Sequence, residues 1–92
     1  MPAIPSGVPQ LEIVRFGNSN PFPSINCWKL VTPNTFDPES KPWVYLSEGY
    51  GTVRLSKVVE VKGWVLYDAI RDERLITRVA LSKRRRWQWM WW

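Results

Sequence analysis

The last ten residues of the chain, 83–92, gather the residue types best suited to chemistry at a contact surface. Consecutive cations run directly into a segment that holds four of the seven tryptophans of the chain. Bulky amphipathic rings beside fixed positive charges suit an anionic partner with apolar faces, such as nucleic acid, a lipid interface or an acidic protein groove. This segment is called the basic-aromatic tail below. Its candidate partner-binding residues are Lys83, Arg84, Arg85, Arg86, Trp87, Trp89, Trp91 and Trp92.

The rest of the chain is nearly neutral, since residues 1–82 carry nine Lys/Arg and eight Asp/Glu. Four of the five net positive charges therefore lie in the tail. One structural reading is that Trp87, Trp89 and Trp91, which alternate, finish a strand and cover the core of their own domain. Met90 and Trp92 fall on the opposite face, so one face cannot bury the set. A large exposed aromatic patch marks an interaction site, and we favour a partner for the tail.

The sequence contains few of the residue types that enzymes commonly use for catalysis. There is no histidine, which removes the commonest general base and the commonest metal ligand. Cys27 is the single cysteine, so the chain has no internal disulfide, no zinc site of its own and no activated thiol. We predict a non-enzymatic protein without cofactor, metal or small-molecule substrate. A histidine-free ribonuclease that uses Arg, Lys, Glu and Tyr is the minor alternative.

The first nine residues read as an extended arm, because prolines at positions 2, 5 and 9 fix φ and remove hydrogen-bond donors. Ile4 and Val8 are the apolar side chains that this arm offers to a partner. We expect a neighbouring molecule, and not the arm's own domain, to hold it in place.

Alternating apolar residues predict short strands at 10–16, 25–32, 43–47, 52–61 and 64–67, the last two joined as a hairpin at Lys62-Gly63. Both faces of 25–32 are largely apolar, so this strand is expected to be central and Cys27 to be buried and chemically quiet. Residues 33–42 form a long polar loop, where Phe36 is a candidate partner contact.

Residues 68–92 allow two readings. A helix capped by Asp68 would present Ile76, Val79, Ala80 and Lys83 on one face. The favoured reading is a polar turn followed by a returning strand whose inward residues are Leu75, Thr77, Val79 and Leu81. The prediction is a mainly β protein, a small antiparallel barrel or sandwich of five to six strands, OB-like or SH3-like, over residues 10–82.

Two extensions of unlike chemistry at opposite ends of a small domain suit a subunit that joins neighbours. We expect a structural or interaction subunit of a multi-subunit assembly, such as a viral or phage particle, whose partners are protein subunits of the same or another kind. The alternatives are a barrel that binds single-stranded nucleic acid and a protein that binds a membrane surface through its tail. No secretory signal or apolar run long enough to span a membrane is visible, which favours the cytoplasm or a particle assembled there.

Overall fold

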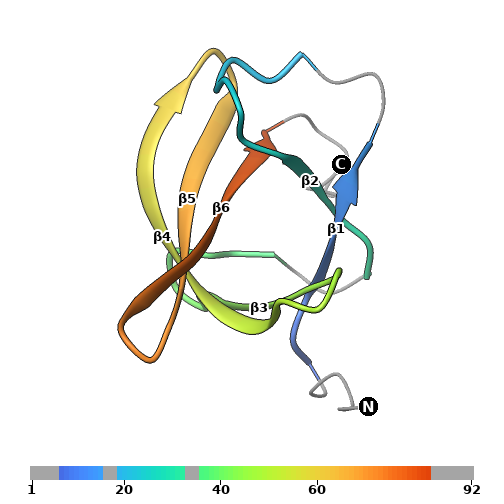
Figure 1. The fold of residues 1–92 in the computed structure, drawn as a ribbon, viewed down its shortest axis with the longest axis vertical. Helices are drawn as coiled ribbons and strands as arrows, with labels where there is room; N and C mark the ends of the chain where they lie inside the picture. Colours follow the sequence, from blue (N-terminus) through green and yellow to red (C-terminus); the bar gives the residue numbers. More distant parts are fainter. Residues whose placement is uncertain (1–6, 16–18, 33–35, 84–92) are drawn as a thin grey trace.

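The computed structural model describes residues 7–15, 19–32 and 36–83. Their strands close into one barrel (Figure 1), which confirms the predicted fold class. The strands are β1 (Gln10–Val14), β2 (Cys27–Leu30), β3 (Trp43–Leu46), β4 (Gly51–Val61), β5 (Trp64–Arg71) and β6 (Arg74–Ser82). No helix of the described residues is long and apolar enough to cross a membrane.

The strand order around the barrel is β1-β2-β6-β5-β4-β3, and the sheet is mixed rather than wholly antiparallel. Strands β1 and β2 form an antiparallel hairpin, and β3 to β6 form an antiparallel meander. The two units join through parallel pairings of β1 with β3 and of β2 with β6. The first and last strands of a four-strand meander run in opposite directions, as the two strands of a hairpin do. The β1–β3 pairing and the β2–β6 pairing, called the seams below, must therefore be both parallel or both antiparallel. Here both are parallel.

The β4–β5 hairpin turns at Lys62 and Gly63, as the sequence predicted. Both residues have positive φ, 50° and 81°, which is the signature of the type I′ turn that matches the twist of the flanking strands. The turn between β5 and β6 has the same signature, with φ of 54° at Asp72 and 63° at Glu73. These two turns place the strands of the meander side by side.

Residues 74–82 form a strand, which confirms the predicted β-structure of this segment. The predicted orientation of Leu75, however, is wrong. Leu75 was expected to point inward and is 52% exposed. The pairing runs from Ala69 with Thr77 directly to Ile70 with Leu75, so Ile76 is the extra residue of a β-bulge. A one-residue insertion moves the following side chains to the other face. Ile76 therefore packs against the core in place of Leu75.

The barrel core is built from the inward side chains of all six strands. Trp28 lies within it, 2% exposed, with its ring edge-on to Tyr50 at a centroid distance of 5.8 Å. Arg71 donates to the backbone oxygens of Tyr50 and Thr52. The buried members are Leu11, Trp28, Phe36, Val44, Leu46, Val53, Leu55, Val65, Tyr67, Ala69, Val79 and Leu81.

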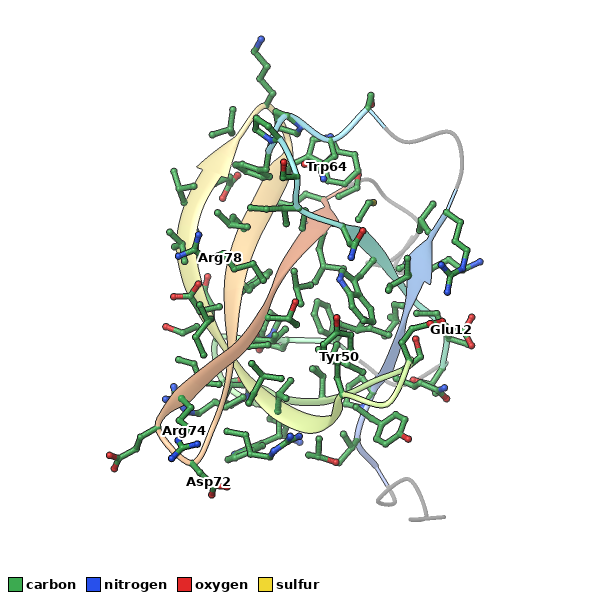
Figure 2. The ribbon with its side chains drawn as sticks, viewed as in Figure 1. Glu12, Tyr50, Trp64, Asp72, Arg74 and Arg78 are labelled. Carbon is green, nitrogen blue, oxygen red and sulfur yellow. The ribbon has the colours of Figure 1, made fainter. Side chains whose placement is uncertain are left out.

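A second, smaller cluster covers the outer side of β2 and its neighbours. Cys27, Trp64 and Ala80 are buried there, and Val14, Phe22 and Ile25 pack against them. The side chain of Asn20 shapes this loop, since it donates to the oxygen of Ile25 at 2.7 Å and accepts from the nitrogen of Phe22 at 2.8 Å. The burial of Cys27 is thus confirmed, whereas β2 is buried on both faces only at Cys27 and Trp28, since Lys29 is exposed. Figure 2 shows Trp64 at the end of the barrel opposite the β5–β6 turn, which carries Asp72 and Arg74.

Two strands run past their partners on one side. β3 pairs with β4 only as far as Arg54, followed by one bond from the nitrogen of Leu55 to the oxygen of Pro42 at 2.9 Å. β4 nevertheless continues to Val61. β2 pairs with Ala80 and Leu81, whereas β6 begins at Arg74. Each of these stretches contains a bulge, which disfavours the addition of a further strand.

Candidate functional site

The structure fixes where the basic-aromatic tail begins. The backbone nitrogen of Lys83 donates to the oxygen of Gly63 at 2.7 Å, which ties the end of β6 to the β4–β5 turn. Figure 1 shows that this turn and the end of β6 lie at the same end of the barrel. Lys83 is the only tail residue that the structure describes. Outside the described residues lie Arg84, Arg85, Arg86, Trp87, Trp89, Trp91 and Trp92.

Glu60 holds the side chain of Lys83. Its two carboxylate oxygens accept from the Nζ of Lys83 at 3.1 Å and from the Nζ of Lys57 at 3.3 Å. The hydrogen bond from Lys83 and then that from Lys57 lower the pKa of Glu60 below its usual value. All three groups are exposed, so the pairs contribute little to stability. Their consequence is local: the side chain of Lys83 is paired with Glu60, whose one negative charge it shares with Lys57.

The end of the predicted arm belongs to the barrel. Pro9 is buried and its oxygen accepts from the nitrogen of Tyr45 at 2.9 Å. This bond continues the β1–β3 seam backward by one residue. Val8 is half-buried, and Ile4 lies outside the described residues. The extended segment available to a partner is therefore shorter than the nine residues expected.

Phe36 is a correction to the expected contact residues. Its position in a polar loop suggested an exposed ring, but the side chain is 7% exposed and belongs to the core cluster. The polar residues around Phe36 gave the wrong prediction, because a long loop across a small barrel can contribute a core residue from its middle. Phe36 is consequently not part of the outer surface of the protein.

The outer faces of β1, β3 and β4 carry a set of side chains that sequence reasoning did not single out. Trp43 is 48% exposed, because its neighbour Val44 points into the core. It lies directly across from Arg54 of β4, which is also exposed. In the adjacent row, half-buried Tyr45 lies between Gln10 of β1 and Thr52 of β4. These five residues are called the Trp43 face below. The signal was present in the sequence: Val44 and Leu46 alternate with Trp43 and Tyr45, so one pair must point outward.

Among the described residues, some arginines of the barrel form ion pairs, and Arg54 of the Trp43 face does not. Arg15 is bound to Glu48 at 2.6 Å, and Arg78 to Asp68 at 3.2 Å. Among residues 7–15, 19–32 and 36–83, no ion pair involves Arg54. On β1 the nearest carboxylate in register is that of Glu12, which lies across from Lys29. The Trp43 face thus presents an uncompensated cation beside two aromatic rings.

Two buried groups have shifted pKa values, and neither forms a reactive pair. Burial raises the pKa of the Cys27 thiol, which lowers the fraction of reactive thiolate. Burial is also the main reason that the pKa of Tyr67 is raised to about 12, with Glu39, Glu60 and Asp37 adding to it. Within the part of the chain that the structure describes, no group of three His, Cys, Asp or Glu residues could hold a metal ion.

Comparison with known proteins identified no relative of this chain. No family model matches the chain, and no curated protein or solved structure matches it either.

Proposed function

We propose that this protein is a non-enzymatic structural or interaction subunit of a larger assembly, which docks through its basic-aromatic tail and its N-terminal arm. One observation carries the proposal. Among the described residues, the strands that close the barrel end at Ser82, and the core cluster draws on residues up to Leu81. The tail follows β6, which already joins the closed ring between β2 and β5, and its first residue is held at the rim by Gly63 and Glu60.

The chemistry of the tail fits a protein groove best. Trp and Arg are the residues most enriched among the anchors of protein interfaces, because they bury a large area and pair with carboxylates. The arm would provide the second contact, through Ile4 and the prolines around it. A subunit with two such contacts can join two neighbours, of its own or another kind. An assembly such as a viral or phage particle, built in the cytoplasm, is the setting we propose.

Single-stranded nucleic acid is the second candidate partner of the tail. The rings of Trp87, Trp89 and Trp91 would stack on bases while Arg84–Arg86 meet phosphates. Lys83 contributes less in this case, because its side chain is already paired with Glu60. A membrane surface with anionic headgroups is the third, since Trp favours the interface. The three partners differ in how binding depends on salt and on the rings.

The test is deletion of residues 87–92 from the full chain. We expect the shortened protein to keep its far-UV circular dichroism and its cooperative unfolding, and to lose its place in the assembly. The matched control replaces Arg84–Arg86 by Gln and leaves the tryptophans. With a protein groove, the control should assemble nearly as well as the wild type, and assembly should respond weakly to salt.

Other outcomes point elsewhere. A log–log salt slope of about −2, lost in the arginine control, would indicate three phosphate contacts and a nucleic-acid partner. Binding to anionic vesicles that the deletion abolishes would indicate a membrane. If the shortened chain unfolds, the tryptophans complete the core, and the docking role is wrong. Normal assembly of a folded, shortened chain would also refute it.

A further inference from the structure

We infer that the Trp43 face binds a short stretch of single-stranded nucleic acid, independently of the basic-aromatic tail. Five outward side chains on three adjacent strands carry this inference: Gln10, Trp43, Tyr45, Thr52 and Arg54. Trp43 and Tyr45 would stack on bases, and Arg54 would contact the phosphate between them. Gln10 and Thr52 lie on either side of Tyr45, where they can bond to base edges or sugars.

The register gives the face its spacing. Trp43 and Tyr45 point outward from the same strand two positions apart, at about 6.6 Å along β3. Trp43 and Arg54 are directly opposed across β3 and β4, where Cβ atoms lie about 4.5–5.5 Å apart. A guanidinium therefore lies within reach of the space between the two rings. Strand positions hold these groups, so little ordering is needed when a ligand binds.

Charge selects an anionic ligand. Arg54 is exposed and has no ion-pair partner among the described residues, while Arg78 and Arg15 elsewhere on the barrel are paired with Asp68 and Glu48. A phosphate would satisfy Arg54 without displacing an existing carboxylate. Residues 1–82 are nearly neutral, with nine Lys/Arg against eight Asp/Glu, so the attraction of a phosphate to this face comes from Arg54 itself.

The position of the rings on the outer side of the barrel favours bases over protein side chains. Hot spots between proteins are anchors that fill pockets, whereas stacking needs only an open ring face. Trp43 is half-exposed on the outside of a barrel, with polar Gln10 and Thr52 in the next row. The row of Trp43 continues through Arg54 to Ile70 and Leu75, which offer apolar surface to sugars and base edges.

The experiment uses the full chain and two fluorescein-labelled probes, a ten-nucleotide oligo(dT) and a ten-nucleotide oligo(U), with affinity measured by fluorescence anisotropy. Trp43→Ala should weaken binding by about tenfold, the usual effect of losing one stacked base. Arg54→Gln should weaken it and reduce the log–log salt slope by about 0.7, the value for one phosphate of a single strand.

Two matched controls separate the face from general effects. Val58→Ala removes apolar surface at a residue that is 51% exposed, beyond the part of β4 that β3 pairs with. Lys62→Gln removes one positive charge at the β4–β5 turn. Both should bind the probes as the wild type does. Unchanged thermal unfolding of all four variants shows that the barrel is intact.

Several results would overturn the inference. One is a wild-type protein that binds neither probe at 50 mM salt. Another is unchanged binding by Trp43→Ala and Arg54→Gln, with binding lost only when Arg84–Arg86 are replaced by Gln, which would assign the nucleic acid to the tail. A third is loss of a protein partner, and not of the probes, on Trp43→Ala; the face would then be a protein contact. The tail-deletion test concerns different residues, so the docking proposal and this inference can fail separately.

Discussion

Tyr67 shows how one buried hydroxyl links stability to pH. Its side chain lies in the core of the barrel, 4% exposed, and burial is the largest cause that raises its pKa from 10.0 to about 12. The folded protein thus keeps the phenol proton at a pH where the unfolded chain releases it. The contribution of Tyr67 is fully present below pH 10 and is lost as the pH rises from 10 to about 12.

We predict that the free energy of unfolding of Tyr67→Phe depends less on pH in the alkaline range than that of its parent. We expect the free energy of unfolding of the parent to fall more steeply above pH 10, because only the parent has the buried phenol of Tyr67, which ionises more readily on unfolding. Urea unfolding between pH 8 and 11.5 measures this. The comparison is best made in a Cys27→Ala background, since the raised pKa of the thiol produces a decline of the same sign. Parallel curves for the two proteins would contradict the expectation.

The indole nitrogen of Trp28 is a buried hydrogen-bond donor that lowers the stability of the fold. Its Nε1 atom is buried and has no hydrogen-bond partner among the described residues, although the ring fills the centre of the barrel. An unsatisfied buried donor costs about 1–3 kcal/mol, whereas the burial of a large aromatic ring contributes more. Packing therefore outweighs hydrogen bonding at this position, with the edge-on contact to Tyr50 as a further gain.

At the scale of elements, the two type I′ turns are unequal. The β4–β5 turn has Gly63 at its second central position, but the β5–β6 turn has Glu73 there, with φ of 63°. A residue with a Cβ in the left-handed region is strained by about 1–2 kcal/mol, and glycine is not. The second turn therefore holds the β5–β6 hairpin together at the cost of backbone strain.

Glu73→Gly should raise the free energy of unfolding by about 0.5–1 kcal/mol, after the extra chain entropy of glycine is subtracted from the strain that is relieved. Gly63→Ala should lower it, although nothing lies within 4 Å of the added Cβ, because φ there is 81°. Urea unfolding of both variants measures the effects. Glu73→Gln serves as the control for the lost charge. A Gly variant no more stable than the Gln variant would show that the turn is not strained.

The strands themselves could be predicted from the sequence, because alternation and turn residues are local signals. The hairpin at Lys62-Gly63 needed only the pattern of 52–67. The bulge at Ile76 could not be predicted, because it depends on how β5 and β6 fit around the barrel. The same holds for the two parallel seams, which join strands with no turn between them. Phe36 was misplaced for a related reason, since its burial depends on where a loop crosses the barrel.

The candidate contact residues were predictable in part. Composition alone identified the basic-aromatic tail, whose residues beyond Lys83 lie outside the described part of the chain. The pairing of Lys83 with Glu60 was beyond prediction, since it joins the ends of β4 and β6. Alternation could have placed Trp43 outward. Its position beside Arg54 required the register of β3 on β4.

For the whole molecule, closure of the ring predicts that it unfolds as one unit. Leu11 lies on the seam of β1 with β3, and Leu81 on that of β2 with β6; both are almost fully buried. Leu11→Ala and Leu81→Ala should each lower the free energy of unfolding by about 2–5 kcal/mol. Each should leave a single transition, coincident by circular dichroism and tryptophan fluorescence.

Leu75→Ala is the matched control at an exposed position, and its effect should stay within about 0.5 kcal/mol. Two separate transitions in either core variant would mean that the β1–β2 hairpin and the meander are independent units, joined only loosely at the seams.

The β2–β6 seam also governs the order in which the protein can fold. Cys27 pairs with Ala80 and Trp28 with Leu81, across more than half of the chain. During synthesis, β1 and β2 emerge first but cannot close the ring until β6 has followed them. The meander forms from neighbouring strands, and the early hairpin must wait with one side of β2 unpartnered. Contacts between such distant residues slow folding, because a large loop must close before they form. The newly made chain therefore depends on β6 to shield β1 and β2.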